Sequence, residues 1–350
     1  MIMKIHLTAL FLLFSIVLCA QENPAAKEIG EAIELMDAGK FSDSRAILEE
    51  VLQDDSTNYD AWYEYAYSFY MQKEYLKAVE IMRKQTKHPQ VTDQLWQIIG
   101  NSLDYSGDSQ AALDAYAEGL MQFPNSGRLY VETGNIYLNQ KNIDMAIQSY
   151  EKGIEMAPEF SSNYFRLAKI YCGTENEIWG ILYGEIFMNL ERNSQRTREM
   201  SAILYQTYQK ALIFDKEKIN ISFAQNATPF TMAFEKNMGL AAAGYRIANK
   251  KVTYNVETLI ALRRSFLVSW MSDAQAKPYQ VLLFDFWQQL DDLGFFDAYS
   301  YWVFNQAPND QFNKWQKNNS TDFSYFIKWY NPNPITIDAN NLFLRTKLLN

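Results

Sequence analysis

The chain has 350 residues, of which 48% are hydrophobic and 15% aromatic, with only 14 glycines and 9 prolines. This composition excludes a disordered tail and favours a largely helical protein, with either one large core or a repeat array followed by a second unit. The formal net charge of −9 argues against nucleic acid and anionic lipid surfaces as partners, because both would repel the chain.

Residues 1–20 have the pattern of a secretory signal peptide. Lys4 supplies positive charge, and an apolar run at 7–18 precedes small residues suited to cleavage. This run is too short to span a bilayer comfortably. The alternative is a lipid anchor on Cys19, although Leu18 stands where such a signal needs a small residue. The stretch resembles export signals of Bacteroidetes, which predicts a location in the periplasm or at the cell surface of a Gram-negative bacterium.

Removal of this segment would leave His88 as the one histidine and Cys172 as the one cysteine. An intramolecular disulfide and a zinc site built from several His and Cys ligands are then excluded. His88 stands beside Pro89 in an expected inter-repeat turn, away from a nucleophile. The sequence also lacks a phosphate-binding glycine loop, a GxSxG turn and an HExxH helix. We therefore expect no cofactor, no metal and no catalytic residues.

A pattern of small, aromatic and proline residues occurs twice between Asp93 and Pro158, with a spacing of 34 positions. Stepping by this period in both directions gives two ladders of small residues: Ala32, Ala66, Gly100, Gly134, Ala168 and Ala202, then Ser44, Ala78, Ala112, Ala146 and Gly180. Two helices can approach closely only where no bulky side chain intervenes. The period therefore predicts a solenoid of helical hairpins.

Larger residues follow the same period, as in Trp62-x2-Tyr65-Ala66-x2-Phe69. This pattern resembles the tetratricopeptide repeat (TPR) over roughly residues 25–214. The resemblance implies an all-α protein, a TPR-type helical-hairpin solenoid followed by a helical C-terminal extension. We expect three parts: a signal peptide at 1–20, a TPR array at 21–214 and a helical, aromatic-rich region at 215–350. Within the array we expect four hairpins, at 25–58, 59–92, 93–126 and 127–160. A degenerate unit at 161–194 and a closing helix at 196–214 should follow them.

The turn inside each hairpin needs a residue that can end a helix. Gly39 and Gly107 can adopt the left-handed conformation that does so. In the fourth repeat the position holds Lys141, and we expect the following Asn142 to take that conformation instead. The second repeat has Lys73-Glu74 there, for which the sequence offers no comparable explanation.

In TPR proteins the first helices line a concave groove, so the resemblance implies where a partner would bind. The implied groove residues are Tyr63, Tyr67, Tyr70, Gln97, Asn101, Tyr105, Arg128, Asn135 and Asn139. Tyrosines and amides offer rigid apolar area with hydrogen bonds, which suits an extended or helical segment of another protein. The alternative is that the tyrosines pack between repeats and the amides are solvated.

Chaperone-binding TPR domains hold a C-terminal carboxylate with a clamp of lysines, arginine and asparagines. Here the expected lysine positions are occupied by Ile29, Tyr63, Gln97, Val131 and Phe165. Asn101 and Asn135 match isolated clamp positions, but the clamp as a whole is absent. The sequence thus argues against a chaperone adaptor.

The repeat pattern is lost after residue 214. A short extended segment is predicted at 219–223. Helices are predicted at about 235–248, 256–272, 279–293, 296–304, 310–316 and 323–329. The sequence Asn331-Pro332-Asn333-Pro334 should stop helix formation, and the tail from Ile335 is expected to be loosely held.

This region is rich in aromatic residues, with 17 between Ala276 and Tyr330. They suggest either a platform for glycans, with Trp302 or Trp315 as contacts, or the core of a helical cap, which their helical spacing favours. Asp285, Asp291 and Asp292 could be considered as a catalytic acid pair, but an exposed acidic face explains them better. The sequence thus favours a non-catalytic interaction scaffold over a glycan-binding protein or an unfamiliar enzyme domain.

Overall fold

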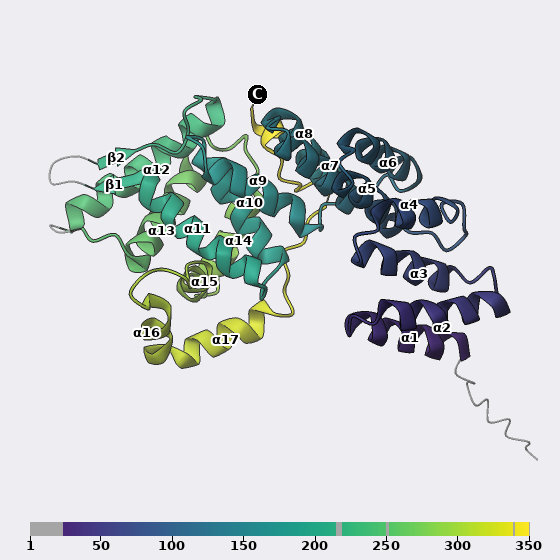
Figure 1. The fold of residues 1–350 in the computed structure, drawn as a ribbon. Coiled ribbons are helices and arrows are strands. Elements are labelled where there is room, and N and C mark those ends of the chain that lie inside the picture. The colour runs from purple at the N-terminus through teal and green to yellow at the C-terminus, as the bar shows by residue number, and fades with distance from the viewer. Residues whose placement is uncertain (1–23, 215–218, 250–251, 339, 350) are drawn as a thin grey trace, which may run out of the picture. The chain divides into compact units, whose positions relative to one another are not determined.

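A computed structural model describes residues 24–214, 219–249, 252–338 and 340–349 (Figure 1). Over these residues the fold is all-α apart from one two-stranded ribbon, which confirms the predicted fold class. The chain divides into two compact units, Met1–Val91 and Thr92–Asn350. The expected signal peptide, with Cys19, lies outside the described residues.

The first unit consists of two helical hairpins. Its helices are α1 (Pro24–Asp37), α2 (Phe41–Asp54), α3 (Tyr59–Met71) and α4 (Tyr75–Arg83). The small residues of the two predicted ladders are fully buried between these helices: Ala32, Ser44, Ala66 and Ala78. Their burial confirms that the hairpin helices meet at small side chains.

The second unit begins with three further hairpins. Their helices are α5 (Asp93–Tyr105), α6 (Ser109–Gln122), α7 (Gly127–Asn139), α8 (Ile143–Met156), α9 (Ser161–Cys172) and α10 (Glu177–Leu190). In two hairpins a glycine faces a tyrosine. A Cβ atom added at Gly100 would lie 2.0 Å from Cε1 of Tyr116, and one at Gly134 would lie 2.3 Å from Cε1 of Tyr150. The tyrosine ring therefore fills the space that any larger residue would need.

The turns inside the hairpins have a left-handed residue, as expected, at Gly39 with φ +76° and Gly107 with φ +96°. The expectation for the fourth repeat is wrong. Lys141 itself is left-handed with φ +61°, and Asn142 instead caps α8 by accepting a hydrogen bond from the Met145 N–H. Lys73 in the second repeat has φ +64°. Both lysines are exposed, so no core packing depends on the side chain at this position.

Helix α10 lies at the centre of the second unit, packed against α9, α11 (Gln195–Ala211) and α14 (Leu282–Asp292) (Figure 1). All of its residues except Leu190 are buried. A Cβ atom at Gly180 would lie 2.6 Å from Sγ of Cys172, and one at Gly184 would lie 2.8 Å from Sδ of Met200. The glycines that make the fifth repeat atypical are thus sites where neighbouring helices approach closely.

The closing helix ends earlier than predicted. After Ala211 the chain forms β1 (Leu212–Phe214), which pairs antiparallel with β2 (Ile219–Ile221) in the register Leu212↔Ile221. Branched and aromatic residues favour an extended backbone over a helix, which explains the change at residue 212. The predicted short extended segment is confirmed at 219–221.

The remaining helices follow the predicted order. They are α12 (Pro229–Ala248), α13 (Val256–Ser272), α14, α15 (Phe296–Val303), α16 (Gln311–Asn318), α17 (Ser320–Tyr330) and a 3₁₀ turn at Arg345–Leu348. The predicted start of α12 at residue 235 is wrong, because Thr228 and Thr231 cap each other reciprocally around Pro229. A threonine takes the place of the usual Glu or Gln of a capping box.

Most of the C-terminal aromatics build a core, as the sequence favours. Trp287 is 1% exposed and Trp302 is 7% exposed. Trp315 stacks on Tyr301, with ring centres 4.4 Å apart and planes inclined by 11°. Trp287 and Trp302 are thus buried in this core, and Trp315 has one face covered by Tyr301, so Trp302 offers no open face to a glycan.

The prediction that the tail is loosely held is wrong. Its apolar side chains are buried, namely Ile335, Ile337, Leu342, Phe343, Leu344 and Leu348. The Phe343 ring lies edge-on to Tyr183 of α10, and Arg345 binds Glu151 of α8 at 3.1 Å. The tail thus runs beside α8 and α10, where the yellow end of the chain lies in Figure 1. The buried apolar residues at both ends of the tail fit an extended strap better than a free end.

The expected boundary between the TPR array and the C-terminal region, at residue 214, stays a prediction from the sequence pattern. In the structure, repeats three to five and the C-terminal helices share one hydrophobic core inside the unit Thr92–Asn350.

Candidate functional site

In the first unit, the predicted groove residues form a row of aromatic rings along α3. Tyr63 and Tyr67 have ring centres 6.1 Å apart with planes inclined by 10°, and Tyr67 and Tyr70 have centres 5.6 Å apart with planes inclined by 20°. Spacings of four and three residues place them on one face of the helix. All three are half-buried, so each keeps some surface for a partner. Their binding role stays a prediction.

Glu64 on the same helix has an unusual protonation equilibrium. Burial, with Asp60 and Asp37 nearby, raises its pKa from 4.5 to about 7. The folded state therefore holds this proton more tightly than the unfolded state, so stability is greatest below pH 4.5 and falls as the pH rises to about 7. For this half-buried, partly screened carboxyl, we expect the first unit to lose on the order of 1 kcal/mol between pH 5 and pH 8.

The measurement is urea denaturation of the whole chain at both pH values, comparing the parent with Glu64→Gln. The variant should lose that part of the pH dependence, because its amide does not titrate. Glu50→Gln, at an exposed position on α2, is the matched control and should keep the parent profile. Equal pH slopes for Glu64→Gln and the parent would contradict the proposed role of Glu64.

In the second unit, the first helices α5 and α7 are joined by one carboxylate. Glu132 accepts a hydrogen bond from Nε2 of Gln97 at 2.7 Å and another from Nδ2 of Asn135 at 2.9 Å. The Oδ1 atom of Asn135 accepts from the Tyr150 hydroxyl at 2.9 Å, and Asn101 accepts from the Tyr116 hydroxyl at 2.5 Å. These bonds fix the orientation of both asparagine side chains.

Two cavities open along this face and meet at Glu132. One has a volume of about 370 Å³ and is lined by Gln94, Gln97, Arg128, Val131, Glu132, Phe160 and Ser162. The other has a volume of about 210 Å³ and is lined by Asn101, Asp104, Tyr105, Tyr116, Glu132, Asn135, Ile136, Leu138, Asn139 and Arg166. All six groove residues predicted for this unit therefore border one of the two cavities.

The lining combines amides with a balanced set of charges. Arg128 and Arg166 are matched by Asp104 and Glu132, so neither cavity is a strong anion site. Val131 and Phe165, at positions where a carboxylate clamp would place lysine, are buried. The face is thus suited to neutral peptide groups more than to a terminal carboxylate.

The sequence prediction did not include Glu132 and Arg166. Both follow from the same 34-residue step, which passes through Glu64, Ile98, Glu132 and Arg166. Three of these four residues are charged. A search for charges at that position would have found the two central charged residues of the cavities.

The other potentially reactive side chains are engaged in contacts within the fold. His88 stacks on Tyr59 at 5.0 Å, and burial raises the pKa of the Cys172 thiol to about 11, which keeps it a thiol at neutral pH. Asp291 and Asp297 both bind Arg264, at 2.8 and 2.6 Å. Within the described part of the chain, no group of three or more His, Cys, Asp or Glu residues is arranged to hold a metal.

Comparison with protein families identifies the repeats. The tetratricopeptide repeat model matches residues 29–90, and a second model of the same repeat matches residues 127–160. The chain therefore contains tetratricopeptide repeats, and its fold is of the all-α TPR type. No curated protein sequence matches the chain.

Solved structures with a similar fold are distant in sequence. A tetratricopeptide repeat protein from Parabacteroides merdae is 13% identical, with 80% of this chain and 97% of that chain covered and a TM-score of 0.40. The C-terminal part of a TPR repeat-containing protein from Cytophaga hutchinsonii is 12% identical, with 71% and 98% covered and a TM-score of 0.40. PilF from Pseudomonas aeruginosa is 16% identical, with 53% and 83% covered and a TM-score of 0.43. Likenesses this distant say nothing about function.

Among the residues that the structure describes, no helix has both the length and the apolar character needed to cross a lipid bilayer.

Proposed function

We propose that this chain is a non-catalytic scaffold that binds a segment of another protein along the face of α5, α7 and α9. The observation that supports this proposal is the pair of cavities that meet at Glu132 and are lined by amides, two tyrosines and two arginines. TPR repeats typically serve protein interaction and not catalysis, which agrees with this assignment.

The chemistry of the lining favours an extended segment. Each side-chain amide carries a donor and an acceptor, as a peptide group does, so Gln94 and Asn139 can pair with the main chain of a bound segment. Tyr105 is 59% exposed and offers a rigid ring against which an apolar side chain can pack. Arg128 and Arg166 lie in different cavities, and each can donate hydrogen bonds to an acidic side chain of the partner.

The tyrosine row of the first unit provides a second contact surface. Tyr63, Tyr67 and Tyr70 expose part of their rings on one side of α3. Half-buried tyrosines lose little conformational entropy on binding, because neighbouring rings already restrict them. We assign this row to the same class of partner, an extended or helical protein segment.

We also propose that the protein acts in the periplasm or at the cell surface of a Gram-negative bacterium. The charged and apolar pattern of residues 1–20 supports this location. Fractionation of cells that express the tagged chain, with mass spectrometry of its N-terminus, tests it. Cleavage after Ala20 would agree with soluble export, and a lipid on Cys19 would agree with a membrane-anchored form. An uncleaved chain found in the cytoplasm would refute the proposal.

Partner binding can be tested by affinity purification of the tagged chain from its own host, followed by titration of the purified partner. The double variant Gln97→Ala with Tyr105→Ala should weaken binding at least tenfold, which corresponds to about 1.4 kcal/mol. Tyr67→Ala tests the tyrosine row of the first unit separately. The far-UV circular dichroism signal should be unchanged, because none of these three side chains is fully buried in the helix core.

Met121→Ala is the control, because Met121 is 80% exposed on α6, a second helix outside both cavities. It should bind the partner with the affinity of the parent. Parent-like affinity in the Gln97→Ala, Tyr105→Ala double variant would refute the proposed binding face on the second unit.

A further inference from the structure

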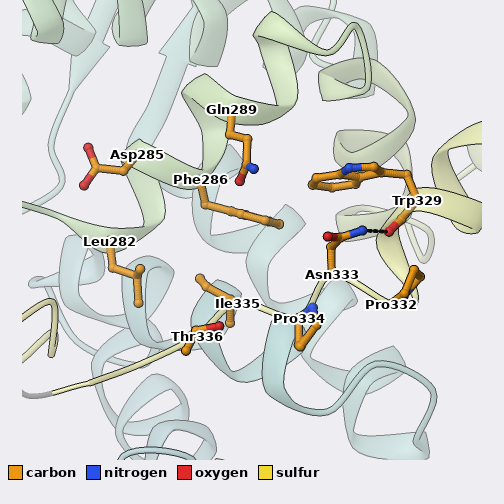
Figure 2. Close-up of a pocket in the computed structure, with 10 residues that line it drawn as sticks. All are labelled: Leu282, Asp285, Phe286, Gln289, Trp329, Pro332, Asn333, Pro334, Ile335 and Thr336. Carbon is orange, nitrogen blue, oxygen red and sulfur yellow. Dashed lines mark hydrogen bonds between the residues drawn. The ribbon is translucent and has the colours of Figure 1, made fainter.

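A larger cavity lies in the C-terminal region, away from the TPR face. It has a volume of about 470 Å³ and is lined by Leu282, Asp285, Phe286, Gln289, Trp329, Pro332, Asn333, Pro334, Ile335 and Thr336. Figure 2 shows it between α14, the end of α17 and the segment that follows. Its volume falls within the range of about 300–1,000 Å³ that is typical of small-molecule sites.

Two aromatic rings form one side of this cavity. The centres of Phe286 and Trp329 are 6.4 Å apart, and their planes are inclined by 24°. Phe286 is almost buried and Trp329 is half-buried, so the indole supplies most of the open aromatic surface. Phe295 packs against the indole at 5.6 Å and holds it in place.

The opposite wall is held by an arginine from the end of the TPR array. Arg192 donates hydrogen bonds to the carbonyl oxygens of Asn331 at 3.3 Å and Asn333 at 3.1 Å, and its guanidinium lies 3.8 Å from the ring centre of Tyr330. Nδ2 of Asn333 donates to the carbonyl of Trp329 at 2.6 Å, a bond drawn in Figure 2. The cavity is thus preformed, which reduces the entropy lost on binding.

Several polar groups around the rings bind no other described residue. The side chains of Gln289 and Thr336 make no hydrogen bond within the described part of the chain, and Oδ1 of Asn333 makes none either. Gln289 points toward the rings, whereas the carboxylate of Asp285 lies at the edge and points away from them (Figure 2). The cavity therefore offers uncharged donors and acceptors next to an aromatic face.

These features select among ligand classes. Among the described residues that line the cavity there is no lysine, arginine or histidine, so an anion would find no opposite charge. A cation would find only Asp285, whose carboxylate is turned away from the rings. A wholly apolar ligand would strip water from Gln289, Asn333 and Thr336 without replacing their hydrogen bonds. A sugar ring has an apolar C–H face for the indole and hydroxyl groups for the amides.

We propose that this cavity binds a neutral saccharide, with one sugar ring packed on Trp329 and its hydroxyl groups bound by Gln289 and Asn333. This site is separate from the protein-binding face on α5, α7 and α9. It also differs from a platform built on Trp302, which is buried, or on Trp315, one face of which stacks on Tyr301.

The test uses the full chain and four neutral probes: maltotriose, cellotriose, xylotriose and mannotriose. Saturation-transfer NMR should detect binding of at least one of them, and calorimetry then gives its affinity. Trp329→Ala should lower that affinity at least tenfold, and Gln289→Ala about threefold to tenfold. Gln289 is exposed, so this second variant remains informative even where Trp329→Ala disturbs folding.

Tyr325→Ala is the control, because Tyr325 is an equally aromatic, 61% exposed residue of the same helix that does not line the cavity. It should leave saccharide affinity unchanged. Absence of binding for all four probes at millimolar concentration would overturn the proposal. Equal affinity in the parent and in both cavity variants would overturn it as well.

Discussion

Gly134→Val is expected to lower the free energy of unfolding by about 3 kcal/mol, at the upper end of the range for overpacked cores. The first atom of the new side chain would already lie 2.3 Å from Cε1 of Tyr150. The ring of Tyr150 cannot swing aside, because it is fully buried and its hydroxyl is bound to Asn135. The measurement is urea denaturation of the whole chain followed by circular dichroism.

The repeats themselves supply the compensating change for this clash. At the ladder position of the first helix, both glycines face a tyrosine 16 positions later, namely Gly100 with Tyr116 and Gly134 with Tyr150. In the second repeat the equivalent pair is Ala66 with Met82, and both are fully buried. Met is slimmer and more adaptable than Tyr, so it leaves room for a Cβ atom.

We therefore expect Gly134→Ala combined with Tyr150→Met to be more stable than the sum of the two single changes predicts. Gly244→Ala on α12 is the control, since a Cβ atom there would meet nothing within 4 Å. It should be neutral or stabilising by about 0.5–1 kcal/mol, the usual gain when alanine replaces glycine in a helix. Strict additivity of the Gly134 and Tyr150 changes would contradict the pairing.

The repeated part of the fold could be predicted from the sequence because its packing is local and periodic. Each hairpin buries small residues against its own partner helix, so a 34-residue step finds Ala66, Gly100 and Gly134 without knowledge of the rest of the chain. The same step places Gln97, Asn101 and Asn135 on one face, and the structure brings them to the cavities beside α5 and α7.

Features that depend on distant contacts could not be found in this way. The tail is ordered by contacts such as Arg345 with Glu151, which are 194 positions apart in the chain. The cavity on Trp329 needs Arg192 to hold the turn at Asn333, and no local pattern connects these residues. Similarly, Lys141 adopts a positive φ angle that residue preferences assign to its neighbour Asn142.

A second large effect is expected at a buried ion pair that joins the TPR array to the C-terminal helices. Glu185 of α10 and Arg263 of α13 are both 0% exposed, with an N–O distance of 2.5 Å. Glu185 also accepts from Nε1 of Trp287 at 2.6 Å, and Arg263 donates to the Ser300 hydroxyl at 3.2 Å. The arginine lies over the indole of Trp287, 4.2 Å from its ring centre.

Arg263→Met is expected to lower the free energy of unfolding by about 3–5 kcal/mol, because it leaves a buried carboxylate without its opposite charge. Burial raises the pKa of Glu185 even beside Arg263, which partly opposes the shift. Without the arginine that pKa should rise further, so the variant should regain stability as the pH falls and Glu185 takes up a proton. Urea denaturation from pH 8 to pH 5 measures both effects.

The double variant Glu185→Leu with Arg263→Met separates the charge from the packing. Replacing both partners of a buried pair with apolar residues of similar size is often neutral or stabilising, so we expect it to recover most of the loss and to lack the pH dependence. Arg264→Met is the matched control, because Arg264 is adjacent in α13 but 40% exposed in its pairing with Asp291. It should cost no more than about 1 kcal/mol. Equal losses for Arg263→Met and Arg264→Met would show that the buried charge does not determine how tightly α10 holds the C-terminal helices.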